Sequence, residues 1–570
     1  MNSLVLMLLV GGAFLLAYNT YGRFLAKRIF RIRPENECPS CSLQDNYDYI
    51  PTPKHVLFGH HFTSIAGLGP IVGPAIVVIW GWVPAILWIV FGSIFFGAVH
   101  DFGALVVSMR KAGRSIGDVA ADLIGPRVRF LFLLIIFFEL WLIIAIFAMI
   151  IAMLFAMYPQ SVIPVWTEIP IAMVLGWWVY VRKGNLFWPS ILAVTLMYVF
   201  VWVGAMVPVD LAALGIASNP LVTWIIIIAV YALIASLLPV QVLLQPRDFI
   251  NSHQLMIAGG LLMAGVVWVH PPILAPAINT SPAGAPPMLP LIFVIMACGA
   301  ISGFHCLVSS GTSSKQCENE RDAQFISYGS MLMEGTLAAL VVISCTAGLT
   351  MGLKVGGEKL VGATAFTTHY ANWHAANGLG AQLDAFIQGA SNILEGMGIP
   401  ESFCLSVMAV FIVSFAATTI DTATRIQRYI VVELGKATNL KPLTGNTAAT
   451  FFAVITALAL AFYDGTGKGA LRLWPLWGTI NQLLAGLALL AVTIYLARKK
   501  ISIIYTLSPM VFMLIVTGWA MVLNVRSFYA TQNWLLLVIG LLVMGLNVWL
   551  ALEGLVALRG FLVKPIQTDD

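Results

Sequence analysis

A polar stripe interrupts an otherwise apolar segment late in the sequence. At helical spacing, one face of that segment carries Thr418, Asp421, Thr422, Arg425 and Tyr429. An aspartate at the centre of a membrane helix costs about 2.5–3.5 kcal/mol, so the stripe must face the interior of a helix bundle. We predict a substrate or ion pathway in which Asp421 carries charge. The alternative is an ion pair between Asp421 and Arg425, four residues apart, which fixes the helix near its inner end.

Two further pairs of titratable side chains suit proton transfer. His60 and His61 are adjacent, and imidazoles change charge near neutral pH. These histidines could equally cap a helix or meet lipid headgroups. His100 and Asp101 lie roughly 15 Å inside the inner end of an apolar helix. This pair could relay a proton, or it could bond a neighbouring helix as a structural contact.

Two apolar segments, 64–74 and 299–314, are interrupted by glycine, serine or proline. Such interruptions break a membrane helix and expose backbone N–H groups, which suit a substrate carboxylate. The alternative is that the glycines serve close helix packing. The predicted substrate-binding residues are Ser64, Gly67, Gly69, Gly73, Ser302, Gly303, His305, Ser309 and Ser310.

A carboxylate inside a membrane protein needs a compensating donor or cation. Arg425 and Lys315 are cations near the inner ends of their helices, within reach of the cytoplasm. We therefore expect backbone and hydroxyl groups to bind the carboxylate, and Arg425 to pair with Asp421 in an inner gate. Arg247 could bind a carboxylate or belong to an inner-face turn. Glu139 is an isolated acid in an apolar helix.

Cys38 and Cys41 form a CxxC motif in a basic loop, with His55 nearby. A second pair of zinc ligands at the usual spacing is missing, so we expect no metal centre, and these three residues are the only candidate ligands. The sequence also has no Walker A loop, catalytic triad or HExxH motif. We therefore expect no enzymatic activity.

The composition requires a membrane environment for the elements that position these residues. Of 570 residues, 60% are hydrophobic and 10% are charged, and the mean hydropathy is +0.92. Soluble domains carry about 25% charged residues, so the solvent of this chain must be lipid. We predict an all-α membrane protein of about fifteen transmembrane helices, at 3–21, 58–79, 82–109, 130–157, 163–181, 186–206, 220–238, 254–270, 289–311, 326–352, 402–430, 446–463, 473–497, 501–524 and 532–556.

The basic residues set the expected orientation. With the N-terminus outside and the C-terminus cytoplasmic, most of the 30 Lys and Arg face the cytoplasm, as the positive-inside rule requires. The net charge of +5 follows from this bias and does not indicate a nucleic-acid partner. The outer segments hold only Lys354, Lys359, Lys468, Arg472 and Arg526.

An internal symmetry divides the chain. The helices after the first form two sets of about seven, and an odd repeat length inverts the second set in the membrane. Each set begins with one of the interrupted segments, which is typical of transporter binding sites. The expected parts are a peripheral first helix and basic cytoplasmic loop (1–51), a first repeat (52–272) and a second repeat (286–560) that includes the outer loop 352–400.

These motifs together resemble the carbon starvation protein A (CstA) family. The resemblance implies uptake of peptides, or of pyruvate by proton symport, in bacteria short of carbon. It also implies a distant relation to LeuT-like transporters of the APC superfamily. By this relation, backbone carbonyls near Ala66 and Gly69 and the hydroxyls of Thr418 and Thr419 would form a sodium site. The matching stretches are 58–74, 97–103, 113–117, 245–248, 301–305, 309–316, 421–425 and 473–478.

We therefore expect a secondary active transporter in the bacterial inner membrane that imports pyruvate or short peptides during carbon starvation. Its coupling ion is the proton, with sodium as the alternative, and no other cofactor is expected. Its partners are the lipid bilayer and a small-molecule substrate, and its oligomeric state stays open. The alternative hypothesis is a channel or nutrient sensor, which the interrupted helices disfavour. The predicted coupling and gating residues are His60, His61, His100, Asp101, Thr418, Thr419, Asp421, Thr422 and Arg425.

Overall fold

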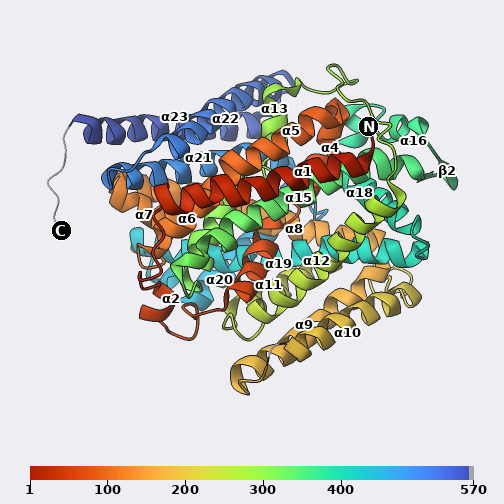
Figure 1. Cartoon of the computed structure of the whole chain (residues 1–570), viewed down its shortest axis with the longest axis horizontal. Helices are drawn as coiled ribbons and strands as arrows, with labels where there is room; N and C mark the ends of the chain where they lie inside the picture. The colour runs from red at the N-terminus through yellow and green to blue at the C-terminus, as the bar shows by residue number, and fades with distance from the viewer. Residues whose placement is uncertain (186, 564–570) are drawn as a thin grey trace.

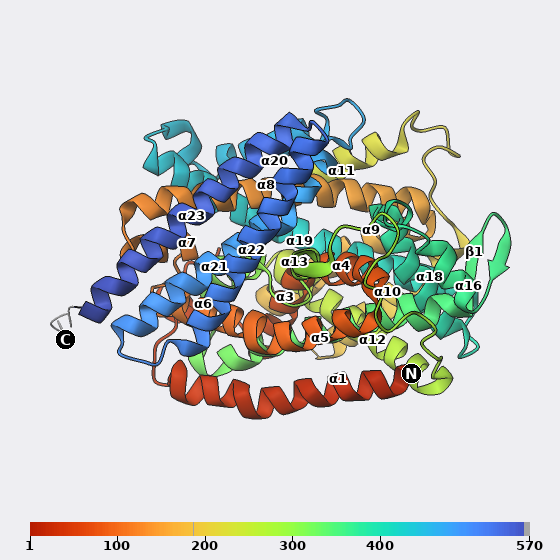
Figure 2. The ribbon, with the colours of Figure 1, turned by 90° about the horizontal axis from the view of Figure 1, so that it is seen from above.

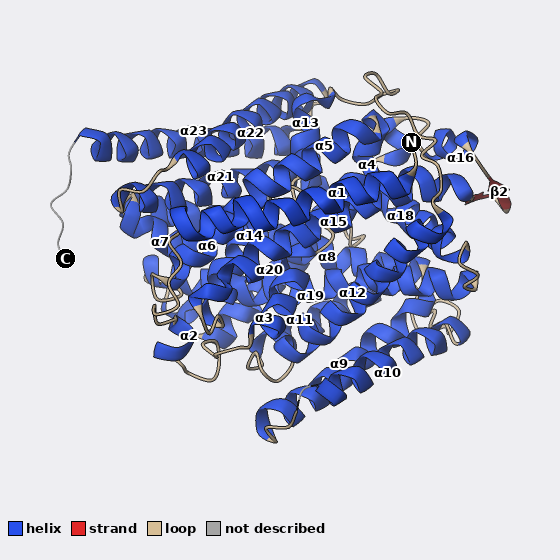
Figure 3. Cartoon of the chain, in the orientation of Figure 1, coloured by secondary structure: helices blue, strands red, loops and turns tan. Residues whose placement is uncertain are grey.

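The computed structural model describes residues 1–185 and 187–563. Most of this part of the chain is helical, as predicted (Figure 3). Its one sheet is an antiparallel hairpin of β1 (Leu353–Val355) and β2 (Glu358–Leu360). The last residues, 564–570, which we expect in the cytoplasm, lie outside the described residues.

Most of the long helices run side by side along the long axis of the molecule (Figure 1). The N-terminus, the hairpin and α16 lie at one end, at the right in Figures 1 and 2, and α7 lies at the other. We call these the outer end and the inner end. The helices at the surface are α1 (Ser3–Ala17), α9 (Val162–Gly176), α10 (Phe187–Met206), α11 (Pro220–Leu237), α22 (Ile504–Ala530) and α23 (Trp534–Val563).

The interior contains the helices that carry the predicted functional residues and the helices that pack against them. These are α3 (Lys54–Ala66), α4 (Gly69–Val77), α5 (Trp82–Gly92), α6 (Ala98–Met109), α8 (Pro126–Met157), α12 (Leu244–Val269), α13 (Met288–Ile295), α14 (Gly303–Gly311), α15 (Gly329–Ile343), α19 (Glu401–Ala437) and α21 (Trp474–Arg498). The remaining helices are α2 (Pro39–Ser42), α7 (Ile116–Leu123), α16 (Ala363–His369), α17 (Trp373–Ala376), α18 (Leu379–Glu395) and α20 (Asn446–Ala461).

Twelve helices in the described residues are long and apolar enough to cross a membrane. A bent pair, α3 with α4, brings the number to 13. Two predicted windows remain. The window 446–463 holds α20, which is shorter, and the window 289–311 holds the separate helices α13 and α14. All fifteen windows therefore contain helix, but the predicted number of fifteen spans is not confirmed.

The outermost helices expose apolar side chains, which suits contact with lipid. In α1, Leu8 and Leu15 are 62% and 69% exposed, whereas Leu6 and Phe14 are buried against the bundle. Within the predicted outer loop 352–400, residues 379–395 form α18. Its apolar face is buried, so α18 packs into the outer end of the bundle.

The first interrupted segment is broken, as the sequence predicts. Helix α3 ends at Ala66 and α4 begins at Gly69, with a bend of 44° between them. Gly67 has φ +45°, a left-handed conformation that favours glycine. A Cβ on Gly69 would lie 2.1 Å from Cβ of Cys298, so this close approach requires glycine.

The second interrupted segment is broken as well. Helix α13 ends at Ile295 and α14 begins at Gly303, and the residues between them are not helical. Cys298 lies in this gap and contacts Gly69. The two breaks therefore touch each other inside the bundle.

Candidate functional site

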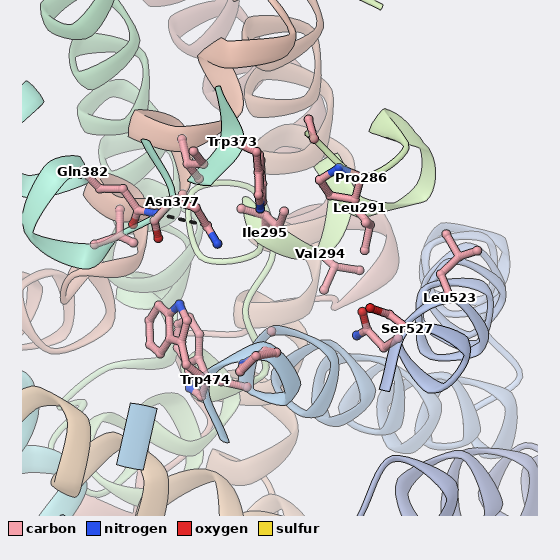
Figure 4. A pocket seen from close by; sticks show the side chains of 18 of the residues that line it. Pro286, Leu291, Val294, Ile295, Trp373, Asn377, Gln382, Trp474, Leu523 and Ser527 are labelled. Atoms are coloured by element: carbon pink, nitrogen blue, oxygen red, sulfur yellow. Dashed lines mark hydrogen bonds between the residues drawn. The ribbon is translucent and has the colours of Figure 1, made fainter. Parts of the chain in front are cut away.

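A cavity of about 600 Å³ extends from the outer end to the two helix breaks. In Figure 4, Asn377 and Gln382 lie on one side of it and Ser527 on the other, with Trp373 above and Trp474 below. Its deep end is formed by residues of both breaks, and none of its described lining residues has a charged side chain. The deep residues are Gly69, Gly73 and Cys298.

Hydroxyl groups of α19 meet the first break. Ser64 Oγ lies 3.0 Å from Thr422 Oγ1, and Thr419 Oγ1 donates to the carbonyl oxygen of Ser64 at 3.4 Å. Thr418 accepts a hydrogen bond from Asn251 of α12 at 3.0 Å. The structure therefore brings the predicted residues of the first break and of the polar stripe together.

The second break is capped by a side chain that we did not include in the site. Asn481 Oδ1 of α21 accepts hydrogen bonds from Ser302 Oγ at 3.1 Å and from the backbone N–H of Phe304 at 2.9 Å. A Cβ on Gly303 would lie 2.1 Å from the Asn481 carbonyl oxygen. The N-terminus of α14 is therefore occupied, in contrast to the exposed N–H groups that we expected there.

The serines farther along α14 have separate environments. Ser310 Oγ donates to the carbonyl of Cys306 at 2.7 Å and accepts from the N–H of Ile116 at 3.0 Å. Ser309 Oγ is buried and has no hydrogen-bond partner among the described residues. Ser309 is therefore the hydroxyl of α14 that is available to a ligand.

Four fully buried titratable side chains from three helices form what we call the histidine cluster: His100, Asp101, His305 and Glu334. Asp101 Oδ1 lies 2.8 Å from His100 Nδ1, and Asp101 Oδ2 lies 3.0 Å from His305 Nδ1. His305 Nε2 lies 3.2 Å from Glu334 Oε2. The cluster joins α6, α14 and α15 behind the second break and can pass a proton between carboxylates and imidazoles.

The two adjacent histidines are buried inside α3 and do not meet lipid headgroups. His60 Nδ1 lies 2.5 Å from Asp248 Oδ2 of α12. His61 Nδ1 lies 2.7 Å from Ser313 Oγ, just beyond α14. They therefore link the first half of one broken helix to α12 and to the second broken helix.

A second buried group, the arginine cluster, consists of Glu168, Tyr231, Arg247 and Asp421. Arg247 donates to Glu168 Oε1 at 2.5 Å and also to Asp421 Oδ2 and the Tyr231 hydroxyl. Tyr231 donates to Asp421 Oδ2 at 2.7 Å. These residues come from α9, α11, α12 and α19, so four helices meet at one guanidinium.

The arginine cluster holds one cation for two carboxylates. Arg247, Glu168 and Asp421 are each at most 1% exposed, and Asp421 Oδ1 accepts no hydrogen bond from the described residues. An uncompensated buried charge costs several kcal/mol, so a proton or another cation would stabilise the cluster. Buried titratable groups inside membrane helices are candidates for an ion pathway.

The predicted ion pair between Asp421 and Arg425 is absent from the structure, so this prediction is wrong. Arg425 instead lies 3.3 Å from Asp48 Oδ1 and donates to the carbonyl oxygen of Leu238. Asp421 bonds Arg247, 174 residues earlier, because α12 packs against this part of α19. The i, i+4 spacing permits a pair, but α12 places Arg247 against Asp421, whereas Arg425 reaches the loop at the inner end.

Arg425 belongs to an inner seal, defined as Tyr47, Asp48, Arg425, Arg428 and Tyr429. Asp48 Oδ1 accepts from the Tyr429 hydroxyl at 2.5 Å and lies 3.7 Å from Arg428. Arg428 also donates to the Tyr47 hydroxyl at 3.2 Å. The loop before α3 thereby covers the inner ends of α11 and α19 with an ion-pair network.

Asp45 shapes this loop. Its Oδ1 accepts the backbone N–H groups of Tyr47, Asp48 and Tyr49 at 2.8–2.9 Å. Partial burial raises the pKa of Asp45, but these three donors outweigh it and lower the pKa below its usual value.

Lys315 lies beside the seal, 4.1 Å from the centre of the Tyr429 ring. Lys315 therefore faces the inner end and not the cavity.

The structure does not assemble Cys38, Cys41 and His55 into a metal site. His55 packs against the Phe325 ring, and Cys41 Sγ faces the Glu318 carbonyl oxygen. In the part of the chain that the structure describes, no group of three or more His, Cys, Asp or Glu side chains is arranged so that it could hold a metal ion.

Sequence reasoning left several residues out of the site. Glu168 and Glu334 are acids inside apolar helices, so the criterion that selected Asp421 could have found them. Asp48 gave no such signal because it lies in a polar loop. For Arg247 the sequence left an inner-face turn as the alternative, whereas the structure buries it at the meeting point of four helices.

Residues 2–520 match the family described as Carbon starvation protein CstA. The chain belongs to the CstA family. Among its relatives, the peptide transporter CstA of Campylobacter jejuni is 33% identical over 549 residues, which cover 88% of this chain and 78% of that protein. The pyruvate/proton symporter BtsT of Escherichia coli is 30% identical over 579 residues, which cover 90% of this chain and 80% of that protein.

Other similarities extend over most of the chain. The peptide transporter CstA of Bacillus subtilis is 32% identical, and the match covers 90% of this chain and 89% of that protein. A solved manganese transporter of Eremococcus coleocola aligns with 91% of this chain and 99% of its own at 14% identity, with a TM-score of 0.39. As a CstA-family member with at least twelve apolar helices, the protein is a multi-pass transporter of the bacterial inner membrane.

Proposed function

We propose that this protein imports pyruvate or short peptides by proton symport when carbon is scarce. The observation that carries the proposal is the arrangement of three features along one axis. An uncharged cavity begins at the outer end, two touching helix breaks form its floor, and the inner seal closes the other end. This arrangement fits the outward-facing state of an alternating-access transporter.

The proposed architecture follows the expected inverted repeats. Residues 52–272 and 286–560 each begin with one broken helix, and 1–51 supplies the peripheral helix and the loop of the inner seal. In this arrangement the chain crosses the membrane about fifteen times, with the broken helices each counted once. The outer end faces the periplasm and the inner end faces the cytoplasm.

The substrate carboxylate binds at the floor of the cavity. Helix α4 begins there, so its N-terminal backbone carries a partial positive charge that favours an anion. Ser64, Gly67, Gly69 and Gly73 belong to this first break. At the second break, Asn481 already occupies the end of α14, so Ser302 and Gly303 act after a rearrangement of that contact. His305, Ser309 and Ser310, farther along α14, complete the proposed substrate-binding set.

The proton binds at the arginine cluster, with Asp421 as its carrier. Asp421 is next to Thr422, which contacts Ser64 of the first break, so α19 connects the proton site with the substrate site. The histidine cluster, with His100 and Asp101, supplies a second path for protons. His60, His61, Thr418 and Thr419 connect these groups around α3.

The test is transport by the purified protein in proteoliposomes. We expect counterflow of labelled pyruvate or of a labelled dipeptide, and accumulation driven by an inward proton gradient without sodium. Accumulation that follows a sodium gradient and ignores pH would overturn proton coupling and favour a site at Ala66, Gly69, Thr418 and Thr419. Flux that dissipates gradients without counterflow would identify a channel, and specific binding without flux would identify a sensor.

A further inference from the structure

A second cavity, of about 770 Å³, opens at the inner end, away from the transport path. We call it the basic cavity. Its lining includes six cationic side chains, and Glu37 is the one acid among its described lining residues. The cations are Arg31, Arg33, Arg110, Lys111, Arg498 and Lys499.

The six cations come from three distant parts of the sequence. Two precede α2, two follow α6 and two end α21, so only the folded bundle brings them together. Like charges that line one cavity repel each other. The positive-inside rule accounts for cations on this side of the membrane, but it does not require them to share a cavity. The arrangement therefore needs a reason beyond membrane topology.

A buried carboxylate behind the lining holds two parts of the basic cavity in place. Glu320, 1% exposed, accepts from Arg110 Nε at 2.5 Å and from the backbone N–H of Arg33 at 2.9 Å. Asn36 Nδ2 donates to the same carboxylate at 2.6 Å, and Arg110 also donates to the Phe30 carbonyl at 2.8 Å. Arg110 and the chain before α2 are therefore held in fixed positions.

Three of the six cations have no acidic partner among the described residues. Glu320 pairs with Arg110, and Asp122 lies 4.0 Å from Lys111. The side chains of Arg31, Arg33 and Lys499 form no ion pair with the described residues. Arginine guanidinium groups bind phosphate oxygens through two parallel hydrogen bonds, and basic pockets at the inner ends of membrane helices bind anionic headgroups.

We propose that the basic cavity binds a ligand with two or more phosphate charges. Its volume accommodates either the headgroup of a diphosphate lipid or a soluble oligophosphate. Both sources share the chemistry that the six cations recognise, and binding experiments can tell them apart.

The experiment measures binding to the purified full chain in a maltoside detergent without phosphate. One arm titrates inorganic triphosphate by calorimetry. The other counts bound cardiolipin by native mass spectrometry, with phosphatidylcholine as the neutral lipid. The test variant is Arg31→Gln/Arg33→Gln/Lys499→Gln. The control, Lys183→Gln/Lys436→Gln/Lys441→Gln, removes the same charge from exposed positions outside the cavity.

We expect the wild type and the control to bind at least one probe, and the test variant to bind it at least about tenfold more weakly. Binding of triphosphate alone assigns a soluble ligand, and binding of cardiolipin alone assigns a lipid. The proposal fails if the wild type binds neither probe. It also fails if both variants lose binding equally, because diffuse surface charge would then explain the affinity.

Discussion

At the residue scale, Asp421 and Glu168 share the single positive charge of Arg247. In water such an excess charge would be screened, but these groups are at most 1% exposed. A bound proton or another cation would therefore stabilise the cluster, and in the proposed mechanism release of the proton changes the forces between α9, α12 and α19. Coupling of this kind requires a titratable group at Asp421.

Asp421→Asn removes the titratable group but keeps an oxygen that accepts from Arg247 and Tyr231. We expect accumulation driven by a pH gradient to fall by more than about tenfold, whereas counterflow, which needs no net proton movement, continues. Both rates are measured in the same proteoliposomes. Asp464→Asn, on an outer turn away from the cluster, is the matched control. An Asp421→Asn protein that still concentrates substrate against its gradient would exclude this residue as the proton carrier.

Ser64 and Arg425 are predicted to affect different kinetic steps. Ser64→Val removes a hydroxyl at the first break, so we expect weaker substrate binding, by about 1 kcal/mol or roughly fivefold. Arg425→Lys replaces the forked donor that joins Asp48 to the Leu238 carbonyl, so we expect slower turnover with nearly unchanged affinity. Binding by calorimetry and turnover by counterflow separate the two effects. Affinity that survives Ser64→Val but collapses in Arg425→Lys would make Arg425 the carboxylate ligand.

Candidate functional residues are easier to predict from the sequence than the side chains to which they bond. Asp421, His100 and Asp101 stand out because charge inside an apolar helix has to be compensated. Their partners depend on packing between helices that are far apart in sequence: Asp421 bonds Arg247, and Asp101 bonds His305, 204 residues away. Local spacing favoured Arg425 for Asp421 and was wrong, because a single sequence carries no information about which helix faces which.

At the scale of elements, the two breaks depend on small residues where the chains approach. Hydropathy located the helices, and glycine located both breaks, because glycine removes the Cβ that would forbid the contact. The Asn481 cap on α14 was not predictable, because the sequence does not indicate which neighbouring helix an asparagine in an apolar helix bonds. The number of spans was also uncertain at α20 and at α13 with α14, where short helices do not satisfy a length criterion.

Gly69→Ala should disable transport through the contact between the breaks. The new Cβ would lie 2.1 Å from Cys298 Cβ, which forces the two segments apart, and we expect uptake to fall by more than about tenfold. Addition of Cys298→Gly removes the clashing atoms and should restore part of the activity. Gly518→Ala, in α22, meets only Asn547 at 3.8 Å and should be neutral. Uptake is measured at equal amounts of protein in the membrane, and full activity of Gly69→Ala alone would contradict the tight contact.

At the scale of the whole molecule, the cavity and the CxxC loop lie at opposite ends. Cys41 is the one exposed cysteine of the seven, and Ser527 is exposed beside the cavity. A membrane-impermeant maleimide should therefore label Ser527→Cys in cells with an opened outer membrane, but not the wild type. Wild-type labelling should appear only after the inner membrane is permeabilised. Labelling of wild-type Cys41 from outside would reverse the proposed orientation.

The single excess charge of the arginine cluster also has an electrical consequence. One proton per cycle makes import of pyruvate, a monoanion, electrically silent, whereas import of a zwitterionic dipeptide moves one positive charge inward. An inside-negative membrane voltage would then leave pyruvate uptake unchanged. It would favour dipeptide uptake by about 2.3 kcal/mol per 100 mV. A potassium diffusion potential imposed on proteoliposomes thus distinguishes the two substrates by current alone.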